Sequence, residues 1–150
     1  MSLLLSQMWE ARANSGDPVA QFNLGYCHEM GQGTPVDLDQ ACQWYRRAAN
    51  QGYPRAQYHL GLACSYGSPG VEWNLVDACK WLSLAARNGI LHAVAALHQL
   101  KVPAEDRALG EKLAREFKPC AEPQAEASSQ GQPTDLSPPP SHPLQIELAL

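Results

Sequence analysis

The chain has 150 residues, 45% of them apolar, and its 11 basic and 15 acidic side chains give it a net charge of −4. This length suffices for one ordinary domain, and the lack of a basic stripe argues against nucleic acid as a partner. No apolar run approaches the roughly 20 residues of a membrane-spanning helix, so we expect no membrane partner either.

The chain opens with the stretch MSLLLSQMWEARA, where we expect a first helix over residues 3–15. It lacks the basic start and apolar length of a secretory signal, which predicts a cytoplasmic protein unless the N-terminus is clipped. Leu4, Leu5, Met8 and Trp9 put apolar side chains on more than one side of this helix. Because repeat arrays usually end in a polar face, this end predicts contact with a second copy or a partner, or else a frayed helix.

An internal repeat follows. Its first part recurs about 36 residues later and its second part about 37 residues later. The one-residue difference in spacing falls in the loop between the two parts. The first copy carries Gly16, Ala20, Gln21, Leu24, Gly25, Ala41, Cys42, Trp44, Ala48 and Ala49. The second copy carries Gly52, Ala56, Gln57, Leu60, Gly61, Ala78, Cys79, Trp81, Ala85 and Ala86. A third copy begins at Gly89 and then degrades.

Capping signals divide each repeat into two helices. Asp17 is followed by a proline, Asp37 and Asn74 each precede a polar residue three positions on, and VPAED places acids in a first helical turn. We expect helices near residues 3–15, 18–30, 38–50, 54–66, 75–88, 90–100 and 103–117. Strand signals are absent, so the chain is predicted to be an all-α array of antiparallel helices.

The predicted domain covers residues 1–117. It consists of a half repeat at 1–15, repeats at about 16–51, 52–88 and 89–101, and a capping helix at 103–117. Residues 118–150 hold seven of the 12 prolines and no aromatic residue, which predicts a disordered tail. Within it PPPSHP favours an extended polyproline segment, and the alternating Leu144, Ile146, Leu148 and Leu150 would suit strand addition to a partner. A plain disordered tail is the favoured interpretation.

Two glycines stand in the middle of predicted helices. Glycine costs about 1 kcal/mol relative to alanine there, yet Gly25 and Gly61 occupy the same repeat position. We therefore predict that two helices cross closely at each glycine, with alanines on the opposing surface. The predicted packing set is Ala20, Leu24, Gly25, Trp44, Ala48, Ala56, Leu60, Gly61, Trp81 and Ala85.

The two copies, AQFNLGYCHEMGQG…ACQWYRRAANQG and AQYHLGLACSYGSPGV…ACKWLSLAARNG, resemble the Sel-one-like repeat family, relatives of the tetratricopeptide repeats. The resemblance covers about residues 9–100, and PAEDRALGEKLAREF resembles the terminal helix of such arrays. It implies a short right-handed α-solenoid of antiparallel helix pairs, an adaptor or scaffold that binds a protein or peptide on its concave helical face. His28 and Cys64 replace the usual aromatic residue, and the cysteines that cross-link some secreted relatives would fall at Gln21 and Ala49, so that disulfide scheme does not carry over.

The cysteines and histidines offer little catalytic chemistry. Two cysteine pairs, Cys27 with Cys42 and Cys64 with Cys79, straddle hairpin turns and could form redox-active disulfides or a metal site. Because they lack the spacing of metal ligands, we favour four buried, reduced thiols. Cys120 is expected to be exposed. No catalytic motif surrounds His28, His59, His92, His98 or His142, so we expect no enzyme and no cofactor; a hydrolase-like enzyme is the least favoured alternative.

A second helical stripe, apolar and aromatic with polar breaks, is predicted to be the binding face. It comprises Asn23, Tyr26, Cys27 and Met30, then His59, Leu62, Ala63 and Tyr66, then Ala96, Gln99 and Leu100. Tyr26, Met30 and Tyr66 are the leading candidates for exposed contacts. The alternative is that these side chains pack inside the solenoid. We thus predict a protein-interaction module; the main alternative is an assembly subunit that self-associates through its incomplete N-terminal repeat.

Overall fold

The computed structural model describes residues 2–122 and contains seven α-helices in that range. Residue 1 and residues 123–150 lie outside the described residues, and so do the polyproline segment and the alternating tail leucines. The helices are α1 Ser2–Asn14, α2 Pro18–Met30, α3 Leu38–Asn50, α4 Pro54–Tyr66, α5 Leu75–Arg87, α6 Leu91–Gln99 and α7 Ala104–Glu116. The described part has no strand, only a single bridge between Ser68 and Val71. The predicted all-α repeat fold is therefore confirmed.

Side-chain caps start three of the helices where the sequence predicts them. The Asp17 carboxylate accepts hydrogen bonds from two N–H groups at the start of α2. Asp37 accepts from the Gln40 N–H and Asn74 from the Asp77 N–H, at the starts of α3 and α5. Because the first N–H groups of a helix have no partner within it, these caps fix where each helix begins.

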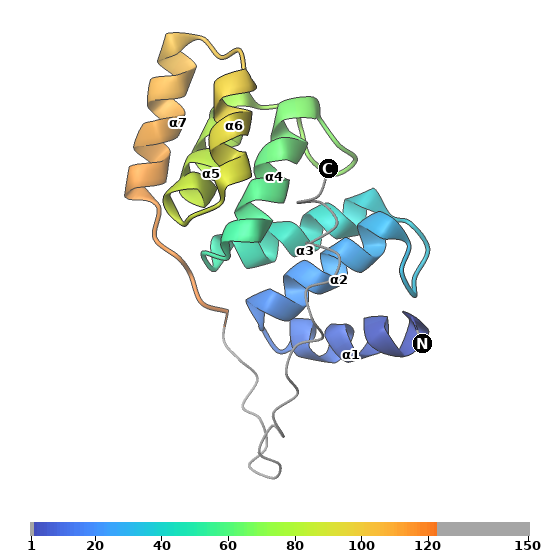
Figure 1. The fold of residues 1–150 in the computed structure, drawn as a ribbon. Coiled ribbons are helices and arrows are strands. Elements are labelled where there is room, and N and C mark those ends of the chain that lie inside the picture. The colour runs from blue at the N-terminus through green and yellow to red at the C-terminus, as the bar shows by residue number, and fades with distance from the viewer. Residues whose placement is uncertain (1, 123–150) are drawn as a thin grey trace.

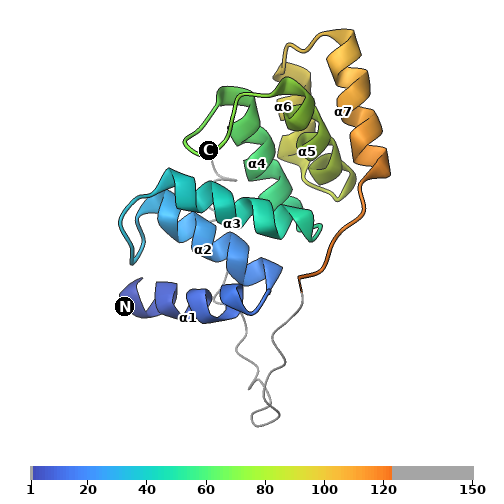
Figure 2. The ribbon, with the colours of Figure 1, turned by 180° about the vertical axis from the view of Figure 1, so that it is seen from behind.

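Each helix packs on its neighbours in the chain, from α1 on α2 to α5 on α6, and α7 then packs on α5 (Figure 1). Seen from behind, α7 covers the side of α5 at the end of the array (Figure 2). A core of small and aromatic side chains runs through these layers, with Phe22, Ala48, Leu60 and Ala85 almost fully buried. The array is thus one continuous stack.

The two mid-helix glycines mark close crossings, as predicted. A Cβ on Gly25 would lie 2.9 Å from Cε1 of Tyr45 and 3.1 Å from the Ala41 carbonyl oxygen, and a Cβ on Gly61 would lie 2.8 Å from Cγ of Leu82. The side chains facing the two glycines are a tyrosine and a leucine, so the prediction that alanine side chains face them is wrong. A large side chain here fills more volume than alanine, and the missing Cβ lets the helices approach it.

Trp44 also differs from its predicted place. It is half-buried, packs against the cluster around Trp9 and Leu24, and carries the Arg47 guanidinium 4.6 Å above its ring. Its repeat partner Trp81 is buried and stacks edge-on against Phe117. The Lys80 ammonium lies 4.2 Å above the Trp81 ring, so both copies place a cation over this tryptophan, and they differ in how deeply the ring is buried.

The five cysteines are free thiols, four of them buried and Cys120 exposed. Burial raises the pKa of the Cys27, Cys42 and Cys79 thiols and raises that of Cys64 to about 11. The thiolate is the reactive form, so the native protein is expected to react with one equivalent of a thiol-specific chromogenic disulfide at neutral pH and with five in urea. Rapid reaction of more than one thiol in the native state would contradict this burial.

A buried glutamine joins successive repeats at the start of α2 and of α4. Gln21 Nε2 donates to the Ala13 carbonyl, and its repeat partner Gln57 donates in the same way to Ala49. At the first junction Gln51 Nε2 also donates to Gln21 Oε1, at 2.9 Å. At the second junction the equivalent Asn88, shorter by one methylene, donates to Leu84 instead, and the buried Gln57 Oε1 accepts no hydrogen bond from the described residues.

Asn88→Gln is therefore expected to stabilise the protein by about 1 kcal/mol, because the longer side chain reaches the unsatisfied oxygen of Gln57. Thermal unfolding followed by circular dichroism should show Tm rising by roughly 4 °C. The converse substitution, Gln51→Asn, should lower Tm by a similar amount. If Asn88→Gln left Tm unchanged or lowered it, the new glutamine would not satisfy Gln57 Oε1 in the way that Gln51 satisfies Gln21.

Candidate functional site

A surface groove lies between α4 and α6, with α5 as its floor. Figure 1 shows α6 lying beside α4 against α5. We call it the α4–α6 groove; it encloses about 400 Å³, enough for one or two large apolar side chains. It is lined by Tyr58, Leu62, Ser65, Tyr66, Leu82, His92, Ala95, Ala96, Gln99 and Leu100.

The groove follows from helical spacing and from side-chain size. Tyr58, Leu62 and Ser65 recur every three or four residues along α4, and the α6 lining residues do the same, so each set forms one face of its helix. On α6 two of those positions are alanines, Ala95 and Ala96, which leave the space open. Leu82 of α5 is almost fully buried beneath it.

The chemistry of the groove is apolar walls with a polar edge. Leucines and alanines form the walls, while tyrosine, histidine and glutamine contribute the polar atoms. Tyr66 at the end of α4 is 74% exposed, an unusually open position for a large aromatic side chain. An apolar groove with a few polar groups and an exposed aromatic residue at its edge suits a side chain supplied by another protein.

The structure brings five of the predicted contact residues together and separates the rest from them. Those that line the groove are Leu62, Tyr66, Ala96, Gln99 and Leu100. Tyr26 is only 4% and His59 only 8% exposed, and Cys27 and Ala63 are also buried; at these positions the alternative of internal packing is correct. Met30 is exposed, and Asn23 donates to the Val19 carbonyl, but neither lines the groove.

Half of the residues that line the groove were not predicted from the sequence. Tyr58, Ser65, Leu82, His92 and Ala95 line it without having been predicted. A signal for α6 was available, because its four lining residues follow the i, i+3, i+4, i+7 pattern of one helical face. No comparable signal existed for Leu82, which belongs to the second helix of its repeat.

A separate cluster of polar side chains surrounds the partly buried Glu29. Its carboxylate accepts a hydrogen bond from the Tyr45 hydroxyl and lies 3.6 Å from Nδ1 of His59. The His59 ring packs among Phe22, Tyr45 and Tyr58, with centroids 5.0–5.6 Å apart. Burial favours a raised pKa for Glu29, but the interactions with His59 and Tyr45 outweigh it and lower the pKa. This group connects α2, α3 and α4, and we assign it to stability.

Residues 2–122 lack two other types of feature, a cluster of metal ligands and a membrane-spanning helix. No group of three or more His, Cys, Asp or Glu side chains is placed there to hold a metal ion. No helix of the described part is long and apolar enough to cross a membrane.

Comparison with known proteins identifies the repeat. A model of the Sel1 repeat family matches residues 18–53 and 54–90, which are α2–α3 and α4–α5 with their connections. A putative sel1-like repeat-containing protein of Acanthamoeba polyphaga mimivirus is 44% identical over 50 residues, 33% of this chain and 9% of that protein. The chitin synthase regulator SKT5 of Saccharomyces cerevisiae is 30% identical over 96 residues, 62% of this chain and 14% of that protein.

Solved structures show the same architecture. The protective antigen c5321 of uropathogenic Escherichia coli, which has an SLR fold, superposes with a TM-score of 0.67 and 32% identity over 75% of this chain and 24% of its own. A Sel1 repeat protein of Oxalobacter formigenes gives a TM-score of 0.54 and 30% identity over 69% and 44% of the two chains. This chain therefore corresponds to only a part of each of these relatives.

Proposed function

Because residues 18–90 of this chain match two repeats of the Sel1 family, we propose that the protein is a non-catalytic interaction module that binds an apolar segment of another protein in the α4–α6 groove. Helical repeat arrays commonly present extended surfaces to partners. The observation that carries the proposal is the groove itself, an apolar trough beside the exposed Tyr66.

The similar proteins support the class of function and leave the target open. SKT5 is named as a regulator of chitin synthase, and a related regulator occurs in Schizosaccharomyces pombe. Such names describe an effect on another protein. We therefore propose that this chain also acts by binding another protein, and we do not carry over the target of these relatives.

The groove predicts how a partner is held. Leucine and alanine walls would take one or two aliphatic or aromatic side chains from a helix or extended segment, and Tyr66 would close over them at the edge. Interface binding energy concentrates in such buried aromatic and apolar contacts. Tyr66→Ala should therefore weaken binding by on the order of 2 kcal/mol, about thirtyfold.

Ala95→Asp tests the site directly. Ala95 is exposed and lines the groove, so an aspartate should leave the fold intact while placing a charge in an apolar contact, and it should weaken binding at least tenfold. The measurement is capture of partners by the tagged chain from lysate, followed by titration of the purified partner.

Ala108→Asp is the matched control, because Ala108 is an exposed residue of α7 that does not line the groove. We expect the partner to be retained by this variant and lost with Ala95→Asp. Equal retention by the two variants would refute the groove as the binding site.

Self-association through α1 remains the second candidate, and the exposure of Leu4, at 70%, is the observation that favours it. The rest of the apolar surface of α1 is mostly used within the chain, since Trp9 is buried and Leu5 packs against its cluster. Sedimentation equilibrium should therefore show the monomer mass up to high micromolar concentration. A mass that rises with concentration in the wild type, but not in Leu4→Asp, would favour self-association.

A further inference from the structure

The chain does not leave the array at the end of α7. Residues 117–122, which we call the strap, run back in an extended path past the ends of the earlier helices (Figures 1 and 2). The Cys120 N–H donates to the Asn50 carbonyl oxygen at 2.9 Å. Residues 118–122 are thus docked on the repeats, and the prediction that the disordered tail begins at residue 118 is wrong for this segment.

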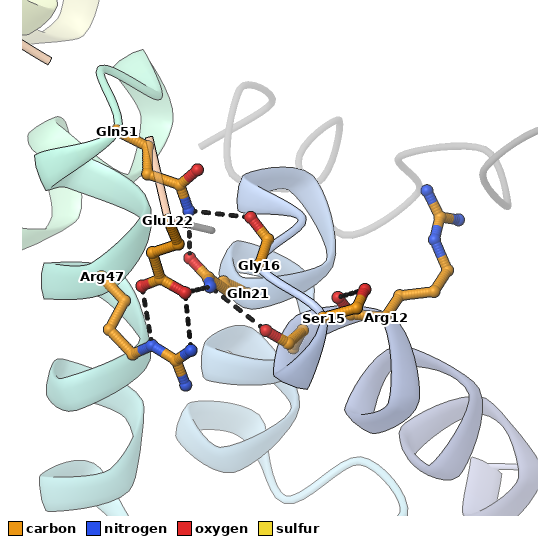
Figure 3. A network of polar contacts seen from close by, with 8 residues as sticks. Arg12, Ser15, Gly16, Gln21, Arg47, Gln51 and Glu122 are labelled. Atoms are coloured by element: carbon orange, nitrogen blue, oxygen red, sulfur yellow. Dashed lines mark hydrogen bonds and ion pairs between the residues drawn. The ribbon is translucent and has the colours of Figure 1, made fainter. Parts of the chain in front are cut away.

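The strap ends in a polar pocket at the first repeat junction. The Glu122 carboxylate accepts two hydrogen bonds from Arg47, at 2.9 and 2.6 Å, and one from Gln21 Nε2 at 2.8 Å (Figure 3). Gln51 orients Gln21 and also donates to the Gly16 carbonyl. A paired guanidinium contact and a buried amide are a strong combination for holding a carboxylate.

Two glycines let the strap approach the backbone. A Cβ on Gly16 would lie 3.3 Å from the Cβ of Glu122, and a Cβ on Gly52 would lie 3.2 Å from Cγ of Pro119. Gly16 and Gly52 are the same repeat position. The strap therefore meets the second junction, at Gly52, through Pro119 and the first junction, at Gly16, through Glu122. Three residues of extended chain span about 10 Å, which is close to the 8–10 Å separation of packed helices.

The two junctions differ in what they can accept. Arg47 and Gln51 of the first junction correspond to Leu84 and Asn88 of the second. The first therefore presents a guanidinium and an amide, whereas the second lacks the cation and takes the apolar ring of Pro119. Together they define a short pattern, a proline followed three residues later by a carboxylate.

We propose that the edge formed by the two junctions is a second binding site, specific for an extended peptide that carries a proline and, three residues later, a glutamate. The strap is its intramolecular ligand, and an acidic segment of another protein with the same pattern competes for the site. The site is separate from the α4–α6 groove, so either can exist without the other.

The tethered strap competes at an effective concentration in the millimolar range, so the site must first be vacated. Glu122→Lys in the full chain sets a lysine against Arg47 and unseats the strap. The probe is a fluorescein-labelled peptide with the sequence of residues 116–123, its cysteine replaced by serine, and fluorescence anisotropy reports binding. We expect the probe to bind the Glu122→Lys protein at least tenfold more tightly than the wild type.

Specificity rests on the carboxylate and on Arg47. A probe with glutamine in place of the glutamate of the pattern should bind the Glu122→Lys protein at least tenfold more weakly. Adding Arg47→Ala should weaken the original probe to the same extent, whereas adding Arg46→Ala, which removes an exposed arginine one residue away, should not. Adding Tyr66→Ala to the Glu122→Lys protein should leave probe binding unchanged, which separates this site from the groove.

Three results would overturn the proposal: no saturable binding to the Glu122→Lys protein, equal affinity of wild type and Glu122→Lys, or equal affinity of the two probes. The last comparison uses a single protein, so it stands even if Arg47→Ala impairs folding. Circular dichroism of each variant verifies the helical content.

Discussion

Gly25→Leu is expected to unfold the repeat array or to lower its free energy of unfolding by about 3 kcal/mol or more. Even the first carbon of the new side chain would lie 2.9 Å from the Tyr45 ring and 3.1 Å from the Ala41 carbonyl oxygen. The ring cannot swing away cheaply, since Tyr45 is buried against Phe22 and its hydroxyl donates to Glu29. Urea denaturation followed by circular dichroism at the helical minimum measures the change.

Ala108→Leu controls for the added side chain. Ala108 is exposed on α7, where leucine and alanine have similar helix propensities, so its urea midpoint should match that of the wild type. A Gly25→Leu protein that unfolds at the wild-type midpoint would show that α2 and α3 do not cross closely at this glycine.

Gly110→Ala is expected to destabilise the protein by about 2–3 kcal/mol, although alanine is favoured over glycine in a helix by about 1 kcal/mol. The sign is decided by contact, because an added Cβ would lie 2.5 Å from Cβ of Cys79 and 2.7 Å from the Val76 carbonyl oxygen. The backbone of α5 would have to move away from α7. The same urea titration serves as the measurement.

The opposite sign for Gly110→Ala would be the informative failure. A more stable variant would mean that helix propensity dominates and that α7 lies farther from α5 than the structure places it. Ala114 is buried one turn further along the same face of α7 and allows a second test. Ala114→Gly opens space there and should also destabilise the protein, by about 1 kcal/mol from helix propensity alone.

The repeat units could be predicted from the sequence because their signals are local. Asp17, Asp37 and Asn74 cap helices through atoms within three residues of themselves. The recurrence of Gly25 as Gly61 added a second, independent copy of the same packing information. Gly110 had no such copy, and its importance comes from a contact with a different helix, so its role could not be predicted.

The α4–α6 groove was harder to predict because a helix in the middle of an array is buried on two sides. Tyr26 and His59 lie on the stripe that the helical phase selects, yet neighbouring helices cover both. Leu62 and Tyr66 share that stripe and line the groove, since the small side chains of α6 face them. Which part of a stripe stays open depends on the neighbouring helix, and the degraded third repeat gave little warning of α6.

The strap could not be anticipated for a similar reason. Residues 118–122 contain a proline and no aromatic side chain, a composition typical of disordered tails. Their order comes from Arg47, Gln21 and Asn50, which lie far away in the chain.

Hydrogen exchange of the full chain, with and without the partner captured by the wild-type protein, tests the central claim most directly. The α4–α6 groove predicts that bound partner slows amide exchange in residues 58–66 and 91–99, with little change in α1. A partner that binds without slowing exchange in these two segments would contradict the account, and the proposed function would have to move to another face.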